Sequence, residues 1–175
     1  MKKTELRKIY KTKRKLLDIK SLSLELCTKL SSTKEYMSAK HIMIYYPLED
    51  EINLLTLMED NSKSFYLPKI VGNNLICCPY RKGDNLTESK FHTLEPNTTQ
   101  IDANKLDLVI IPALACDKSK CRLGYGGGFY DRFLKTTNAK KIVCISQSQI
   151  TETIFPNEYD VPVDIIITEE NNYNW

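Results

Sequence analysis

The chain has 175 residues, of which 42% are hydrophobic and 27% charged, and its formal net charge is +3. This length and composition are typical of one globular domain, so a single domain over residues 1–175 is expected. No apolar run approaches the ~20 residues that cross a bilayer, and the N-terminus lacks the apolar core of a secretory signal. We therefore expect a cytoplasmic protein that does not associate with membranes.

The N-terminal segment is predicted to be helical and is strongly basic. Apolar residues recur at helical spacing over residues 3–30, which predicts one or two amphipathic helices. Residues 1–20 carry nine Lys or Arg and two acidic residues, whereas the rest of the chain is net acidic. Such a segment can be a solvated helix face, a nucleic-acid contact or one wall of a polyphosphate site. Lys3 and Arg7 are neighbours on this helix, and an anion between them would turn their repulsion into attraction.

Further along, short apolar runs alternate with polar and helical stretches. Helices are predicted over residues 53–59 and 129–137, and the polar segment 80–104 is a long ordered excursion. Two of the apolar runs, 106–111 and 165–167, are almost uniformly apolar, as in strands covered on both faces. The pattern predicts an α/β fold, a three-layer sandwich with a largely parallel central sheet flanked by helices. The predicted strands are 41–46, 64–67, 75–79, 106–111, 141–145 and 164–168.

A glycine-rich run lies between a strand-like and a helix-like segment. Residues 122–132 contain four of the six glycines, which favours backbone with positive φ or close approach of another molecule. Arg122 before the glycines could clamp an anion, and Asp131 after them could hold a divalent cation. The run matches neither the Walker A loop nor the dinucleotide fingerprint, so a tight connection without a ligand is the alternative.

The remaining polar residues offer fewer candidates for chemistry. The chain has two histidines, of which His41 opens a strand and is expected to be structural. The six cysteines lack the spacing of a zinc site, and a packed thiol is expected even at Cys121, where Arg122 could lower the pKa. Carboxylates near strand ends are stronger candidates: Asp131, Asp160 and Asp164.

The glycine-rich run and several other segments together carry a family resemblance. The run reads Arg-Leu-Gly-Tyr-Gly-Gly-Gly-Phe-Tyr-Asp-Arg over 122–132, and it is accompanied in order by Lys3 and Arg7, Tyr-Tyr-Pro at 45–47 with Glu51, and Asp-Val-Pro-Val-Asp at 160–164. Over nearly its whole length the sequence resembles the 5-formyltetrahydrofolate cyclo-ligase family, also called 5,10-methenyltetrahydrofolate synthetases.

The resemblance implies an enzyme of one-carbon metabolism. Its reaction would be the ATP- and Mg²⁺-dependent cyclisation of 5-formyltetrahydrofolate to 5,10-methenyltetrahydrofolate, with release of ADP and phosphate. Because an amide oxygen is a poor leaving group, its phosphorylation to an iminium phosphate would let folate N10 close the ring. A phosphoryl transfer of this kind depends on positioning and charge neutralisation more than on covalent help from the protein.

The resemblance also assigns roles to individual residues. Arg122 and Tyr130 would be catalytic, and Asp131 and Asp164 would bind Mg²⁺. The substrate would contact Tyr46, Glu51, Tyr125, Gly126, Gly127, Gly128 and Phe129. ATP would contact Lys3, Arg7, Arg122, Gly124, Tyr125, Gly126, Gly127, Gly128, Phe129 and Tyr130.

Two other functions remain open at this point. One is an α/β protein that binds ATP or another phosphorylated ligand without this reaction. The other is a nucleic-acid-binding module that uses the basic N-terminal helix, although few aromatic residues interleave the basic ones there. The family resemblance favours a monomer whose partner is the small-molecule substrate rather than nucleic acid.

Overall fold

The computed structural model describes residues 1–174, and Trp175 lies outside the described residues. Its centre is a seven-stranded sheet with strand order β12-β11-β9-β6-β1-β2-β3. The pairs from β11 through β9, β6 and β1 to β2 are parallel, and only the edge strands β12 and β3 run antiparallel. The strands are β1 (His41–Met43), β2 (Ser64–Val71), β3 (Asn74–Tyr80), β6 (Leu108–Ile110), β9 (Lys140–Cys144), β11 (Ile165–Ile167) and β12 (Asn172–Tyr173).

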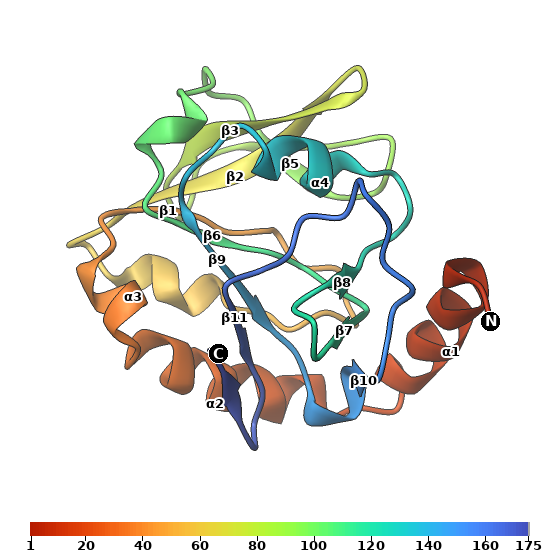
Figure 1. Ribbon diagram of the computed structural model, residues 1–175. Coiled ribbons are helices and arrows are strands. Elements are labelled where there is room, and N and C mark those ends of the chain that lie inside the picture. The colour runs from red at the N-terminus through yellow and green to blue at the C-terminus, as the bar shows by residue number, and fades with distance from the viewer. Residues whose placement is uncertain (175) are drawn as a thin grey trace.

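Helices cover both faces of this sheet (Figure 1). On one face lie α2 (Ile19–Ser31) and α3 (Lys34–Ser38), and on the other lies α4 (Phe129–Leu134). Along β6, Leu108 and Ile110 pack toward α2 and α3, while Val109 packs toward α4. This alternation explains the uniformly apolar strand, since both faces are buried. The predicted three-layer α/β fold with a largely parallel sheet is confirmed.

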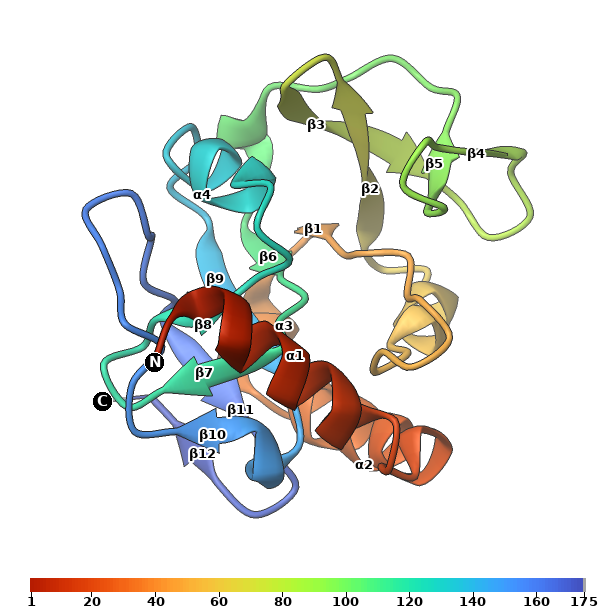
Figure 2. The same ribbon diagram turned by 90° about the vertical axis from the view of Figure 1, so that its right-hand side faces the viewer.

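The first helix packs against a second, smaller sheet. That sheet has the order β10-β7-β8 and contains β7 (Ala115–Asp117), β8 (Arg122–Leu123) and β10 (Ile150–Thr151). Leu6 and Tyr10 of α1 (Lys3–Arg14) pack on Leu114 and Leu123 there. Figure 2 shows α1 lying across β7 and β8. The basic helix is thereby held beside the glycine-rich run, which begins with β8.

Several predicted elements differ in detail from the structure. The helix expected over 53–59 is the 3-10 turn η1 (Leu55–Glu59), and the helix expected to reach 137 ends at Leu134. The predicted N-terminal helical region is two helices, because Asp18 caps α2 through the backbone N–H of Ser21 at 3.1 Å. The polar excursion contains a hairpin of β4 (Leu86–Glu88) and β5 (Leu94–Pro96), then the turn η2 (Ala103–Lys105); a further turn, η3 (Gln147–Gln149), precedes β10.

Candidate functional site

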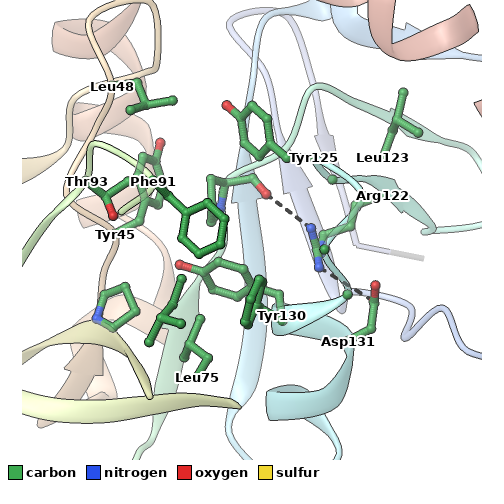
Figure 3. A pocket seen from close by; sticks show the side chains of 18 of the residues that line it. Tyr45, Leu48, Leu75, Phe91, Thr93, Arg122, Leu123, Tyr125, Tyr130 and Asp131 are labelled. Atoms are coloured by element: carbon green, nitrogen blue, oxygen red, sulfur yellow. Dashed lines mark hydrogen bonds and ion pairs between the residues drawn. The ribbon is translucent and has the colours of Figure 1, made fainter. Parts of the chain in front are cut away.

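A cavity of about 520 Å³ opens beside the carboxyl ends of β1 and β6. Parallel α/β sheets place ligand sites at this edge because the loops that leave the strands there are free to diverge. Figure 3 shows side chains from widely separated segments pointing into it. The lining comes from α1, strands β2 and β3, the segments after β1 and β6, the β4–β5 hairpin, the loop before β11, and the whole of 122–131.

The glycine-rich loop forms one wall of the cavity, and its backbone needs glycine. Gly126 has φ +106°, and Gly128, the N-cap residue just before α4, has φ +70°. At Gly124 a Cβ atom would lie 2.7 Å from Nη1 of Arg122. The loop therefore combines left-handed backbone with close approach of a guanidinium, as the glycine content predicts.

Three predicted cationic residues meet along this wall. Arg7 donates from Nε to the carbonyl oxygen of Gly124 at 2.8 Å, and Lys3 forms an ion pair with Asp160. Arg122 is 6% exposed; its Nη2 lies 3.5 Å from the Asp131 carboxylate, and its Nη1 donates to the Pro112 carbonyl oxygen at 3.4 Å. Its Nε is buried without a hydrogen-bond partner among the described residues. A buried guanidinium with spare donors is suited to an anionic ligand.

The opposite wall carries a buried carboxylate. Glu51 is 6% exposed, accepts from the backbone N–H of Leu48 at 2.7 Å, and accepts from the Tyr125 hydroxyl. Burial raises the pKa of Glu51, although these hydrogen bonds and nearby Arg14 oppose the shift. Tyr46 lines the same wall next to Tyr45, whose hydroxyl donates to the carbonyl oxygen of Ile52 at 2.7 Å.

Aromatic residues close the remaining side. Phe91, at the tip of the β4–β5 hairpin, meets Phe129 edge to face with ring centroids 5.6 Å apart. Tyr130 lies beneath the Arg122 guanidinium, 5.3 Å from ring centroid to Cζ, and burial raises the pKa of its phenol. This phenol therefore stays protonated at neutral pH and can donate a hydrogen bond. The apolar, aromatic side of the cavity is suited to a flat ring system.

The structure places the two predicted metal ligands on different segments. Asp131 lines the cavity and accepts from the backbone N–H of Val161 at 3.2 Å. Asp164, three residues after Val161, precedes β11 and accepts from the backbone N–H of Lys141 at 2.8 Å. It is not among the cavity residues. That Asp131 and Asp164 bind Mg²⁺ stays a prediction.

Some cavity residues had no assigned role in the sequence prediction. Asp160 lines the cavity, and its neighbours Asn157 and Tyr159 do so too. Phe91 and Thr93 reach it from the hairpin inside the polar excursion, whose length was the only sequence signal for them. Arg14 contacts Glu51 and Tyr125 from behind the wall. Cys121 is buried and burial raises its pKa, in line with a packed thiol.

Comparison with known proteins identifies the class to which this fold and site belong. The sequence profile of the 5-formyltetrahydrofolate cyclo-ligase family matches residues 1–169. The 5-formyltetrahydrofolate cyclo-ligase of Haemophilus influenzae is 30% identical over 146 residues, covering 76% of this chain and 78% of the relative. That of Escherichia coli K12 is 26% identical, covering 85% of this chain and 88% of the relative.

Solved structures agree with this assignment. The NMR structure of Aquifex aeolicus 5,10-methenyltetrahydrofolate synthetase superposes with a TM-score of 0.88 at 30% identity, covering 99% of this chain and 93% of the other. The synthetase from Mycoplasma pneumoniae has the same fold, with a TM-score of 0.79 at 24% identity, covering 97% of this chain and 99% of the other.

The chain therefore belongs to the 5-formyltetrahydrofolate cyclo-ligase family. It is an enzyme that cyclises 5-formyltetrahydrofolate to 5,10-methenyltetrahydrofolate, as the resemblance implied. ATP is the co-substrate that the family name implies, since a ligase couples bond formation to cleavage of a nucleoside triphosphate.

Proposed function

We propose that Lys3, Arg7 and Arg122 bind the phosphates of ATP in this cavity, together with the backbone of Gly124 to Tyr130. The observation that supports this most directly is the convergence of three cationic side chains, from the first helix and the glycine-rich loop, on one cavity. The spare donor of Arg122 and the backbone N–H groups of the loop would neutralise and orient the triphosphate.

The folate would occupy the other half of the cavity. Its pteridine ring is flat and presents N–H donors on one edge, so a buried carboxylate is a suitable acceptor. Glu51 and Tyr46 supply that edge of the cavity, and the segment from Tyr125 to Phe129 would close over the formyl group. With both ligands bound, the formyl oxygen would face the terminal phosphate near Arg122.

The reaction would proceed in two steps. The formyl oxygen attacks the γ-phosphorus, the bond from phosphorus to ADP breaks, and the N5 lone pair forms an iminium phosphate. Folate N10 then attacks the formyl carbon, the carbon–oxygen bond breaks, phosphate leaves, and N10 loses its proton to solvent. Arg122 and Tyr130 would be the catalytic residues: the guanidinium stabilises charge on the transferred phosphoryl group, and the neutral phenol donates a hydrogen bond to it.

The cavity contains a carboxylate that is suited to Mg²⁺. Asp131 supplies a carboxylate beside Arg122, and hard cations prefer such oxygen ligands. No group of three or more His, Cys, Asp or Glu suited to a metal occurs within residues 1–174, so Asp131, with Asp164 as the second predicted ligand, would hold Mg²⁺ mainly together with phosphate oxygens and water. When bound, the ion would neutralise charge on the triphosphate.

The domain organisation, location and oligomeric state of the enzyme are also part of the proposal. We propose a single domain over 1–175 that acts in the cytoplasm as a monomer, without nucleic acid or membrane partners. Two basic residues of α1 line the cavity, which gives the basic helix a small-molecule ligand in place of nucleic acid. Within residues 1–174 no helix is long and apolar enough to span a bilayer. Light scattering on the purified protein tests the monomer.

The experiment that tests the site is a coupled absorbance assay. The near-ultraviolet band of the methenyl product should form only when ATP, Mg²⁺ and 5-formyltetrahydrofolate are all present. Glu51→Gln should raise KM for the folate and leave KM for ATP unchanged, whereas Arg7→Met should do the reverse. If both variants keep wild-type constants, the proposed assignment of the two halves of the cavity is wrong.

A further inference from the structure

Arg14, in the last turn of α1, is a buried cation outside the proposed ligand contacts. It is 4% exposed, and it does not line the cavity. Its Nη1 donates to the hydroxyl oxygen of Tyr125 at 2.7 Å, and its Nη2 donates to the Asp50 carboxylate at 2.7 Å. A buried guanidinium is costly unless it is paired. Its position behind the cavity wall therefore calls for an explanation beyond surface solvation.

The contacts of Arg14 connect the three segments that surround the folate half of the cavity. From α1 it reaches the Glu51 carboxylate, with Nη1 3.9 Å from Oε1, as well as the glycine-rich loop at Tyr125. Because Arg14 donates to the phenolic oxygen, the Tyr125 hydroxyl is free to donate its proton to Glu51, and it does. The result is a directional chain from Arg14 through Tyr125 to Glu51.

We propose that Arg14 is a positioning residue for the cyclo-ligase reaction, holding the Glu51 carboxylate and the Tyr125 hydroxyl in the arrangement that receives the pteridine ring. The inference rests on the proposed function, in which Glu51 contacts the folate. Arg14 itself would touch neither substrate. Its guanidinium would act through Glu51, by keeping a carboxylate that is surrounded by protein in its charged form.

The electrostatics around Glu51 give this role a measurable consequence. The charge of Arg14 lowers the pKa of Glu51, and the like charge of Asp50 opposes it. Without Arg14, the pKa of Glu51 would rise further above its ordinary value, since burial already raises it. The other titratable groups that face Glu51 are the phenols of Tyr45, Tyr125 and Tyr130, which are neutral at pH 7.

Folate binding should depend on pH through the charge of Glu51. If the folate binds the charged carboxylate, binding weakens as the pH falls through the pKa of Glu51. A rise of about one in that pKa weakens binding about tenfold at pH values below it and leaves binding unchanged well above it. Removing Arg14 should therefore impair folate binding more at pH 6 than at pH 8.5.

The test measures the dissociation constant of 5-formyltetrahydrofolate by calorimetry, without ATP, at pH 6 and pH 8.5. Arg14→Met should weaken binding more at pH 6 than at pH 8.5, by up to about tenfold, and recover toward wild type at pH 8.5. Arg14→Lys, which keeps the charge, should restore much of the loss at pH 6. Lys8→Met removes a cation from the exposed side of the same helix and should leave both values unchanged.

Further variants separate the inference from the proposed function. Wild-type folate affinity in Glu51→Gln would overturn the proposed function, whereas weakened binding in Glu51→Gln together with a pH-independent effect of Arg14→Met would overturn only the role of Arg14. If Arg14→Met does not fold, Tyr125→Phe interrupts the same chain. Tyr125→Phe should then weaken folate binding more at pH 6 than at pH 8.5, and equal effects at both pH values would contradict the inference.

Discussion

The ammonium group of Lys3 and the carboxylate of Asp160 form an ion pair at the cavity, joining residues that are 157 positions apart in the chain. Both side chains are mostly buried, with 18% and 12% of their surfaces exposed. The Asp160 carboxylate is held in turn by the backbone N–H of Asn157 at 2.7 Å. The first helix and the loop before the last parallel strand thus meet where the triphosphate is proposed to bind.

Replacing Lys3 should weaken ATP binding in two ways, because Lys3 is proposed to contact the phosphates and also pairs with Asp160. Lys3→Met removes a charged phosphate contact, which costs about 1.5 to 3 kcal/mol and should raise KM for ATP roughly 10- to 150-fold. It also leaves Asp160 facing the phosphates as an unpaired negative charge. Lys3→Met with Asp160→Asn should therefore bind ATP better than Lys3→Met alone. Steady-state kinetics of the two variants check this, with Glu158→Gln as an exposed control in the same loop.

Arg122 should contribute to catalysis as well as to binding. Arg122→Ala removes a buried guanidinium beside Asp131. We expect kcat/KM for ATP to fall roughly 10- to 150-fold, which corresponds to a loss of about 1.5 to 3 kcal/mol in transition-state stabilisation. Arg122→Lys should recover little, because an ammonium group lacks the planar fork of donors. Arg81→Met removes an exposed arginine and serves as the control. Unchanged kinetics in folded Arg122→Ala would contradict its assigned role.

Two glycines with positive φ can separate the effect of close approach to Arg7 from the effect of backbone strain. Gly126 and Gly83 have φ of +106° and +97°, so alanine at either position should cost about 1 to 3 kcal/mol of stability. A Cβ at position 126 would also lie 3.3 Å from Cζ of Arg7, whereas at position 83 nothing lies within 4 Å. Thermal unfolding should show both variants destabilised. Only Gly126→Ala should raise KM for ATP, and an equal rise in Gly83→Ala would point to strain alone.

Magnesium dependence should test the two aspartates that the sequence predicts as metal ligands. Asp131→Asn removes the negative charge but can still accept from Val161, so the fold should persist while more Mg²⁺ is needed for half-maximal activity. Asp164→Asn can likewise still accept from Lys141, and it should also need more Mg²⁺. Titration of each variant with Mg²⁺ after treatment with a chelator measures this. A wild-type requirement in either variant would remove that aspartate from the metal site.

The elements that were predictable from sequence have a strong local pattern. The run 106–111 is almost uniformly apolar because β6 is covered on both faces, and the glycines of 124–128 mark a loop with positive φ. The hairpin at 86–96 was missed because its strands are only three residues long and lack an apolar run. Phe91 thus reached the cavity from a segment in which nothing but length indicated a role.

The sequence by itself determined the α/β class, the family, and the cationic and glycine residues of the cavity, because each depends on a contiguous motif or a repeating pattern. Only the tertiary structure decided which distant side chains meet. It paired Lys3 with Asp160 and Arg14 with Glu51 and Tyr125. Such contacts follow from the order and direction of strands in the sheet, which bring some loops to one edge and send others to the opposite edge.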